Sequence, residues 1–335
     1  MPDMKNSVTI IDVAKAAGVS VSTVSRVLNN KDDVSDATFR HVSSVIDELA
    51  YSSSLAAKSM RSRMTNVIGL IMPDVEDPFS ILVMKGVNRA IVELDYDLLI
   101  YTNGEIGRSA STVTEQQYIS LLNSSVTDGV IVVTPVAPAY SSSSPVVTVD
   151  PNIDNPNGPT VASTNFKGAV EATEHLIASG HKRIGYISGR VELLCTHQRL
   201  EGYQAALTGA GICIDPQLIT PGDFTTATGR IRARQLLSMD DPPTAIFASN
   251  DQTAIGVYEE AIQLGISIPE NLSVIGFDNI PESSFYDLTT VDQFADRMGY
   301  IGARMLHDLI HGRPLAAERE IIDTQLIVRN SAQPI

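Results

Sequence analysis

Apolar and amphipathic segments alternate along residues 65–335. Short apolar runs typical of buried strands include 67–72, 129–133 and 245–248. Segments with helical periodicity, such as 226–237, lie between runs of this kind. Strands that alternate with helices form parallel sheets with right-handed crossovers. The larger part of the chain is therefore predicted to be an α/β domain with parallel sheets.

This alternation occurs twice along the chain. The first unit includes a strand-like run over 146–149, and the pattern restarts after Asn165 with a helix to Ser179 and a strand over 183–187. Two α/β units in series predict two similar lobes. Ligands of open parallel sheets bind beyond the carboxyl ends of the strands, so a cleft between the lobes is the expected binding site.

The N-terminal residues 8–28 follow a different pattern, that of two short helices joined by a tight turn. Apolar residues from Ile10 to Ala17 recur at i, i+3, i+4 and i+7, on one helical face. Gly18 can adopt a left-handed conformation, and Ser20 can cap the second helix. A third helix over about 36–49 is predicted to begin after Ser35.

Two short helices around a glycine-containing turn are typical of a helix-turn-helix, whose second helix enters the major groove of DNA. The exposed face of that helix carries Ser22, Ser25 and Arg26. Serine can bond phosphates or bases, and arginine is the best bidentate partner for guanine. The alternative is a three-helix bundle used only for packing. The turn and the polar face favour DNA binding.

The run VTIIDVAKAAGVSVSTVSRVLN over residues 8–29, followed by Val34 and Ser35, resembles the lactose-repressor (LacI/GalR) family of bacterial transcription regulators. The resemblance extends through the rest of the chain. It implies that bases are read by Val21, Ser22 and Arg26, and that phosphates are contacted by Thr9, Ser20, Thr23, Ser25, Asn29 and Ser35. An apolar Val21 suits contact with a thymine methyl group.

The resemblance also implies a hinge helix in the serine-rich linker, 51–64, that folds on operator DNA. Paired across a dimer, two such helices would enter the minor groove. Met60 occupies the position of the apolar wedge that kinks a central base step, and Lys58 is a further expected DNA contact. Serines stand at 53 and 54, where the family usually has Pro-Asn, so the start of the hinge helix stays open. A flexible linker is the alternative.

Three parts follow from the resemblance: a helix-turn-helix domain over 1–50, the hinge over 51–64, and a ligand-binding and dimerisation domain over 65–335. The last is expected to have the two-lobed type I periplasmic-binding-protein-like fold. The chain of that fold crosses between the lobes three times, here near Val161, Val291 and Ile321. The N-lobe then comprises about 65–161 and 293–320, and the C-lobe about 162–291 and 322–335.

Polar and aromatic residues at predicted strand ends and loop starts match the family's effector positions. Each has a plainer alternative, because an aspartate after a strand is often a helix cap and Phe79 could be core. Arg, Asn and Asp together supply the donors and acceptors that sugar hydroxyls need, and aromatic rings can pack on an apolar sugar face. Cys195 and His197 are expected to tune selectivity. The predicted ligand-binding residues are Asp74, Phe79, Asp150, Cys195, His197, Arg199, Phe224, Asn250, Asp278 and Gln293.

The charge distribution supports a DNA-contacting head. Residues 1–64 carry eight Lys and Arg against seven Asp and Glu, so their net charge is +1. The remainder of the chain has a net charge of −16, which gives −15 for the whole chain. An acidic body repels phosphates and confines DNA contact to the head. No run of eighteen apolar residues and no signal peptide is present, so a cytoplasmic location without membrane contact is expected.

The motifs of other protein classes are absent from the sequence. There is no G-x-x-x-x-G-K-[ST] loop, no H-E-x-x-H and no G-x-S-x-G, so the chain is not expected to be an enzyme. The two cysteines, Cys195 and Cys213, have no metal-ligand spacing, so neither a disulfide framework nor a metal site is expected. A transport-type solute-binding protein is a distant alternative that the DNA-binding head argues against.

The sequence therefore predicts a transcription repressor that binds near-palindromic operator DNA as a homodimer, with no cofactor. Its operator affinity is expected to respond to a small-molecule effector, a sugar or sugar derivative. The alternative is a regulator that responds to a purine or nucleoside by corepression. Both arrangements reduce to differential ligand affinity for two lobe arrangements coupled to the hinge.

Overall fold

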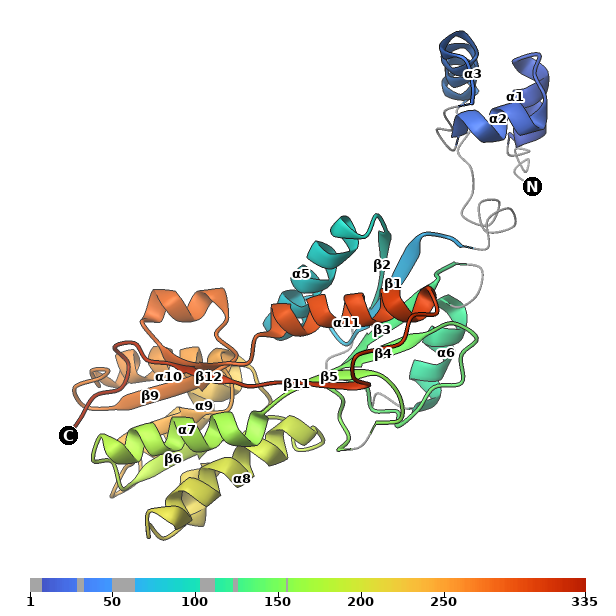
Figure 1. Ribbon diagram of the computed structural model, residues 1–335. Helices are drawn as coiled ribbons and strands as arrows, with labels where there is room; N and C mark the ends of the chain where they lie inside the picture. Colours follow the sequence, from blue (N-terminus) through green and yellow to red (C-terminus); the bar gives the residue numbers. More distant parts are fainter. Residues whose placement is uncertain (1–7, 29–32, 50–63, 103–111, 123–125, 155) are drawn as a thin grey trace, which may run out of the picture. The chain divides into compact units, whose positions relative to one another are not determined.

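The computed structural model describes residues 8–28, 33–49, 64–102, 112–122, 126–154 and 156–335. The chain divides into two compact units, Met1–Thr65 and Asn66–Ile335 (Figure 1). The linker predicted to form a hinge helix lies almost entirely outside the described residues. Within the described residues, no helix is long and apolar enough to span a membrane.

The first unit contains three short helices, α1 (Ile10–Ala16), α2 (Val21–Leu28) and α3 (Asp36–Glu48). Gly18 has φ +64° in the turn between α1 and α2, a conformation that glycine adopts without a steric penalty. The core of the unit is small and aliphatic. It consists of Val13, Ala14, Ala17, Val24, Val27, Val42 and Val45.

The second unit contains two six-stranded sheets, one in each lobe. The N-lobe sheet has the order β11-β5-β4-β3-β1-β2 and is parallel throughout. The C-lobe sheet has the order β12-β10-β9-β8-β6-β7, with only β12 antiparallel. The N-lobe elements are β1 (Val67–Met72), α5 (Pro78–Glu93), β2 (Asp97–Thr102), α6 (Thr112–Leu122), β3 (Gly129–Val133), β4 (Val146–Val149), β5 (Thr160–Ser163), α11 (Ala295–Ile310) and β11 (Arg319–Ile322).

The C-lobe is built in the same way, with two short 3₁₀ helices, η1 and η2, added. Its elements are α7 (Asn165–Ala178), β6 (Ile184–Ile187), α8 (Leu194–Gly209), η1 (Pro216–Leu218), β7 (Ile219–Thr220), α9 (Thr226–Leu237), β8 (Ala245–Ala248), α10 (Asp251–Leu264), β9 (Ser273–Phe277), η2 (Pro281–Tyr286), β10 (Thr289–Asp292) and β12 (Gln325–Ile327). The ends of β1, β3, β4, β8 and α9 coincide with the predicted ends.

Both faces of each sheet are covered, which explains why the strands are continuous apolar runs. In β1, Ile68, Leu70 and Met72 point toward α5 and α11, whereas Ile71 points toward α6. The C-lobe repeats this arrangement, with α7 and α8 on one face and α9 and α10 on the other. The sequence alternation predicted the parallel sheets.

Helices α5 and α11 lie side by side on the N-lobe sheet (Figure 1). Gly86 makes their close approach possible, because a Cβ at this position would lie 1.7 Å from the carbonyl oxygen of Asp296. Gly299 does the same from α11, where a Cβ would lie 2.0 Å from the carbonyl oxygen of Val83. α11 is thereby held in the N-lobe although it follows a C-lobe strand.

The chain crosses between the lobes three times, a few residues later than predicted. The crossings join β5 to α7, β10 to α11 and β11 to β12. The predicted positions Val161, Val291 and Ile321 instead lie inside β5, β10 and β11. The crossings come later because each strand continues to its last hydrogen-bonded residue before the chain leaves the lobe.

Candidate ligand-binding cleft and DNA-contacting helix

A cavity of about 280 Å³ lies between the two lobes, at the carboxyl ends of their strands. Most of the residues that line it are polar or charged, and two are phenylalanines. The residues that line it are Pro73, Asp74, Glu76, Asp77, Pro78, Phe79, Thr134, Asp150, Arg190, Leu193, Cys195, Arg199, Asp223, Phe224, Thr225, Thr226, Asn250, Gln252, Asp278 and Gln293.

Nine of the ten predicted ligand-binding residues line this cavity, and His197 does not. Helix α8 begins at Leu194, so His197 lies within its first turn. Cys195 and Arg199 are four residues apart and share the helix face toward the cavity. His197 is two residues from each, so it projects from the opposite side and is exposed.

Arg199 is a buried residue whose guanidinium donors are already engaged by the protein. Its Nε donates to Asn165 Oδ1 at 2.9 Å, and its Nη1 donates to the Ser249 carbonyl at 2.5 Å. Its Nη2 lies 3.4 Å from Asp278 Oδ1, and the guanidinium carbon is 3.7 Å from the centre of the Phe277 ring. Only 3% of the residue is exposed, so Arg199 organises the cleft and has few donors left for a ligand.

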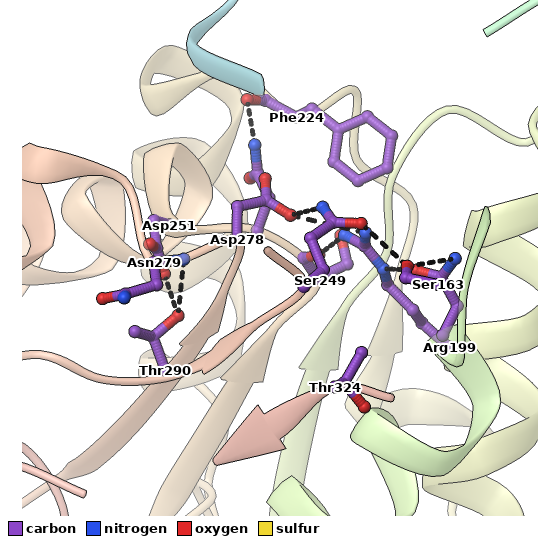
Figure 2. A network of polar contacts seen from close by, with 12 residues as sticks. Ser163, Arg199, Phe224, Ser249, Asp251, Asp278, Asn279, Thr290 and Thr324 are labelled. Carbon is purple, nitrogen blue, oxygen red and sulfur yellow. Dashed lines mark hydrogen bonds and ion pairs between the residues drawn. The ribbon is translucent and has the colours of Figure 1, made fainter. Parts of the chain in front are cut away.

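Arg199 belongs to a closed ring of five polar side chains. Gln293 Nε2 donates to Asp278 Oδ1 at 2.6 Å, and Ser163 Oγ donates to Gln293 Oε1 at 3.1 Å. Asn165 Nδ2 donates to Ser163 Oγ at 3.4 Å, which returns the ring to Arg199. Figure 2 shows Ser163 and Asp278 on either side of Arg199 in this network.

This ring connects the cavity to the interlobe crossings. Ser163 ends β5 at the first crossing, and Gln293 follows β10 at the second. The third crossing is tied to the first, because the hydroxyls of Thr164 and Thr324 lie 3.0 Å apart. Hydrogen bonds therefore link all three crossings, and two of them link directly to a cavity wall.

Two carboxyl groups in the cavity have a raised pKa. Burial raises the pKa of Asp278 to about 7, with Arg199 opposing the shift and the charges of Asp77 and Asp150 adding to it. Burial likewise raises the pKa of Asp150 to about 6, again against the effect of Arg199. Perturbed carboxyls in a cleft are characteristic of functional sites.

Several cavity residues have left-handed backbones that only glycine adopts freely. Values of φ are +49° at Thr134, +52° at Asp150, +71° at Phe224 and +104° at Asp278. Such conformations cost on the order of 1–3 kcal/mol each and persist where the surrounding fold holds them. They turn the chain sharply at the cleft, and three of these residues, Thr134, Asp150 and Asp278, directly follow their strands.

The cavity is also lined by polar residues that were not among the predicted ones, including Arg190, Thr134, Asp77, Asp223 and Gln252. The rule that selected Asp150 would also have found Thr134, because it directly follows β3. Arg190 lies three residues beyond the end of β6, after Ser188 and Gly189. Gly189 is required there, since a Cβ would lie 1.9 Å from the Phe224 ring.

In the head, Ser22 and Arg26 are exposed on α2, whereas Val24 and Val27 are buried on its other side. Other hydroxyls predicted to contact phosphate also cap helices. Thr9 and Asp12 form a capping box on α1, and Ser35 accepts from the Thr38 amide at 3.3 Å. Ser20 Oγ accepts from the Thr23 amide at 3.1 Å. Val21 and Ser25 lie on α2; Asn29, Lys58 and Met60 lie outside the described residues.

Asp33 forms an ion pair with Arg26, the arginine predicted to read a base. Arg26 Nε lies 3.4 Å from Asp33 Oδ2, and both side chains are more than half exposed. The ion pair occupies the guanidinium that the sequence assigns to a base.

Comparisons with known proteins agree with both parts of this description. Residues 9–54 match the lacI family of bacterial regulatory proteins, and residues 173–332 match a periplasmic binding protein-like domain. The HTH-type transcriptional repressor CytR of Escherichia coli strain K12 is 34% identical over 339 residues, with 99% of this chain and 98% of CytR covered.

Two solved structures extend the comparison to the fold. A complex of the transcriptional regulator CelR with cellobiose matches with TM-score 0.70 and 29% identity, over 97% of this chain and 99% of that chain. The lac repressor dimer bound to operator and an anti-inducer matches with TM-score 0.82 and 23% identity, over 97% and 99% of the two chains, a likeness of fold alone. With its helix-turn-helix, its two-lobed body and its relatives, this chain belongs to the lacI family of bacterial transcription regulators.

Proposed function

We propose that this protein is an operator-binding repressor whose DNA affinity is set by a sugar or sugar derivative held in the cleft. The observation that carries the proposal is the hydrogen-bonded ring from Arg199 and Asp278 to the crossings at Ser163 and Gln293. Because of this ring, a ligand that contacts the cavity wall also changes the contacts that set the angle between the lobes.

Support for a carbohydrate comes from the chemistry of the cavity. Phe79 and Phe224 offer aromatic faces, and the remaining wall offers amide, hydroxyl and carboxylate groups. The related regulator CelR has been solved with cellobiose bound. An effector acts through its difference in affinity for the two lobe arrangements, so contact with both lobes is the expected binding mode.

DNA recognition is assigned to α2 of the head. Ser22 and Arg26 are exposed on the same face, and Arg26 suits a guanine edge. One small head makes few phosphate contacts, so we propose that two copies bind a near-palindromic site as a homodimer.

The test uses the full chain. Selection on random duplexes should return a two-fold symmetric site, and labelled operator is then titrated with and without each sugar. An effector should change operator affinity by roughly 5- to 150-fold, the usual range of allosteric coupling. A sugar that binds in calorimetry but leaves operator affinity unchanged would contradict the proposed switch.

A further inference from the structure

Helix α8 begins without a cap of its own. Its N-cap residue, Leu193, has no side chain that accepts a hydrogen bond, and its first turn contains no acidic residue. The first amides of a helix have no partner within the helix, so they need an acceptor from elsewhere. In α9 and α10, the N-cap side chains of Thr225 and Asn250 supply one. The amide of Leu194, the first residue of α8, therefore needs an acceptor from outside the helix.

The acceptor comes from the opposite lobe. Asn152 lies between β4 and β5 of the N-lobe, whereas α8 belongs to the C-lobe (Figure 1). The amide of Leu194 donates to Asn152 Oδ1, and Asn152 Nδ2 donates to the Glu192 carbonyl at 2.9 Å. The backbone amide of Asn152 donates to the Pro135 carbonyl at 2.9 Å, which anchors the residue in its own lobe. One amide side chain thus caps α8 and also holds the turn that precedes it.

This contact differs in its position from the hydrogen bonds at the interlobe crossings. The bonds of Ser163 and Thr164 lie where the chain itself passes from one lobe to the other. Asn152, Glu192 and Leu194 belong to no crossing, and none of the three lines the cavity. Their two hydrogen bonds can therefore form only while the lobes are together. They are also separate from the residues that a ligand in the cavity would contact.

We propose that Asn152 is a latch between the lobes, which caps α8 in the lobe arrangement described here and releases it when the lobes separate. Because it makes Asn152 a positioning residue of the effector switch, this assignment rests on the proposed function. On separation, the amide of Leu194 loses its acceptor and α8 loses its cap. A lost N-cap bond shifts an equilibrium by roughly 2- to 30-fold, so the latch biases the balance between the two lobe arrangements by about that factor.

Cys195 provides a probe of lobe separation within the chain itself. It directly follows Leu194 and lines the cavity, where burial raises the pKa of its thiol to about 12. A thiol with a raised pKa reacts slowly with iodoacetamide, and separation of the lobes would hydrate it and admit the reagent. The substitution Cys213→Ser, at an exposed position, leaves Cys195 as the only cysteine. The alkylation rate of the full chain then measures how often the lobes separate.

In this background, Asn152→Ala should raise the rate of Cys195 alkylation by roughly 2- to 30-fold, because the arrangement with separated lobes becomes more populated. Asn157→Ala is the matched control, since Asn157 is an exposed asparagine between the same two strands. This control should leave the alkylation rate unchanged.

A second variant separates lobe opening from fraying of an uncapped α8, which would also expose Cys195. Leu194→Pro removes the amide donor but keeps the helix, because proline is favoured at the first helical position. Leu193 already has φ −97° and ψ 135°, the extended backbone that a residue before proline adopts. Faster alkylation in both Asn152→Ala and Leu194→Pro is the expected result. An unchanged rate in Asn152→Ala, or a faster rate that Leu194→Pro does not share, overturns the latch.

Failure of the latch is distinguishable from failure of the proposed function, because alkylation requires neither effector nor operator. An effector that contacts both lobes favours the latched arrangement, so Asn152→Ala should weaken its binding by a similar factor. The same variant should shift the operator affinity of the effector-free protein in the direction opposite to the effector's own shift. Faster alkylation with unchanged operator affinity supports the latch and rejects the switch. Unchanged alkylation, with an effector that does change operator affinity, rejects the latch and leaves the switch standing.

Discussion

At the scale of single residues, the guanidinium predicted to read a base is paired with a carboxylate of the head itself. Arg26 is paired with Asp33 at 3.4 Å, and both are exposed, so the pair is weak in free energy. Its effect on recognition can be larger, because Asp33 would also approach DNA phosphates with the same sign of charge. Asp33 is thus placed to lower the affinity of the head for every duplex.

We expect Asp33→Asn to raise affinity for operator and non-operator DNA alike by a few-fold, because a negative charge near phosphate is removed and Arg26 is released. Asp47→Asn makes the same charge change at an exposed position of α3 and is the control. Arg26→Ala should do the opposite for operator only, weakening it by roughly 1–3 kcal/mol. Fluorescence titrations at fixed salt measure all three; an unchanged or lower affinity for Asp33→Asn contradicts the expectation.

The cleft carboxyls predict a pH dependence of stability. Burial raises the pKa of Asp278 to about 7 against Arg199, with Asp77 and Asp150 nearby and Gln293 donating to it. A carboxyl whose pKa is higher in the folded state binds protons more tightly there, so its contribution to stability is largest at low pH. It is lost as the pH rises from about 4, the pKa of an unfolded aspartate, to about 7.

Asp278→Asn should therefore flatten the pH dependence of the free energy of unfolding between about pH 4 and pH 7. Urea unfolding of the full chain is measured at several pH values, following the transition of residues 66–335. The slope of the free energy of unfolding against pH is then compared between wild type and variant. Asp154→Asn, an exposed aspartate, is the control. A slope identical in wild type and Asp278→Asn would show that Asp278 does not titrate in this window.

At the scale of elements, the N-lobe depends on two helices that touch through glycines. α5 and α11 come from opposite ends of the body, and Gly86 faces the backbone of Asp296 across their contact. The approach is tight enough that no side chain fits. The pairing fixes α11 against the N-lobe sheet and hence the direction of the second crossing.

Gly86→Ala should destabilise the body by about 1–3 kcal/mol or more, because the helices must separate to admit the methyl group. Gly209→Ala, at the end of α8, is the control, since a Cβ there meets nothing within 4 Å. That change should be neutral or slightly stabilising because alanine favours helix over glycine. Equal midpoints of thermal unfolding for the two variants would contradict the close contact.

The crossings are also element-scale features, and Ser163 is the hydroxyl through which the first meets the second. Ser163→Ala should leave effector affinity within a few-fold but reduce the effector-induced change in operator affinity. Ser238→Ala, at the end of α9 and outside the ring, should change neither. Calorimetry and operator titration separate the two effects, and full coupling in Ser163→Ala would remove the ring from the mechanism.

At the scale of the whole molecule, a nearly neutral head is joined to an acidic body, with a net charge of −15 over the full chain. The charge difference confines DNA contact to the head. It also makes each head a weak binder by itself, so the proposed dimer has to present two heads to one site.

A duplex with two symmetric half-sites should therefore bind far more tightly than a duplex with one. Joining two weak contacts raises apparent affinity by roughly 10²- to 10⁴-fold when both can be engaged. Electrophoretic titration of the two duplexes, with sedimentation to establish the oligomeric state, measures the difference. Equal affinities would mean that one head acts alone.

Local sequence patterns were enough to predict the architecture, because hydrophobic periodicity and turn chemistry depend on neighbouring residues. Apolar runs such as Val67–Met72 identified buried parallel strands, and Gly18 with Ser20 identified the helix-turn-helix. The rule that ligands bind beyond strand carboxyl ends located most of the cleft, including Asp150 and Asp278.

Contacts between distant segments determine which of those residues are free to contact a ligand. The guanidinium of Arg199 already contacts Asn165, Ser249 and Asp278, which lie 34 to 79 positions away in the chain. The buried Nε of Arg190 has no hydrogen-bond partner among the described residues, and the position of His197 in α8 turns its side chain away from the cavity. Burial, charge pairing and helix phase depend on distant segments, so no local pattern encodes them.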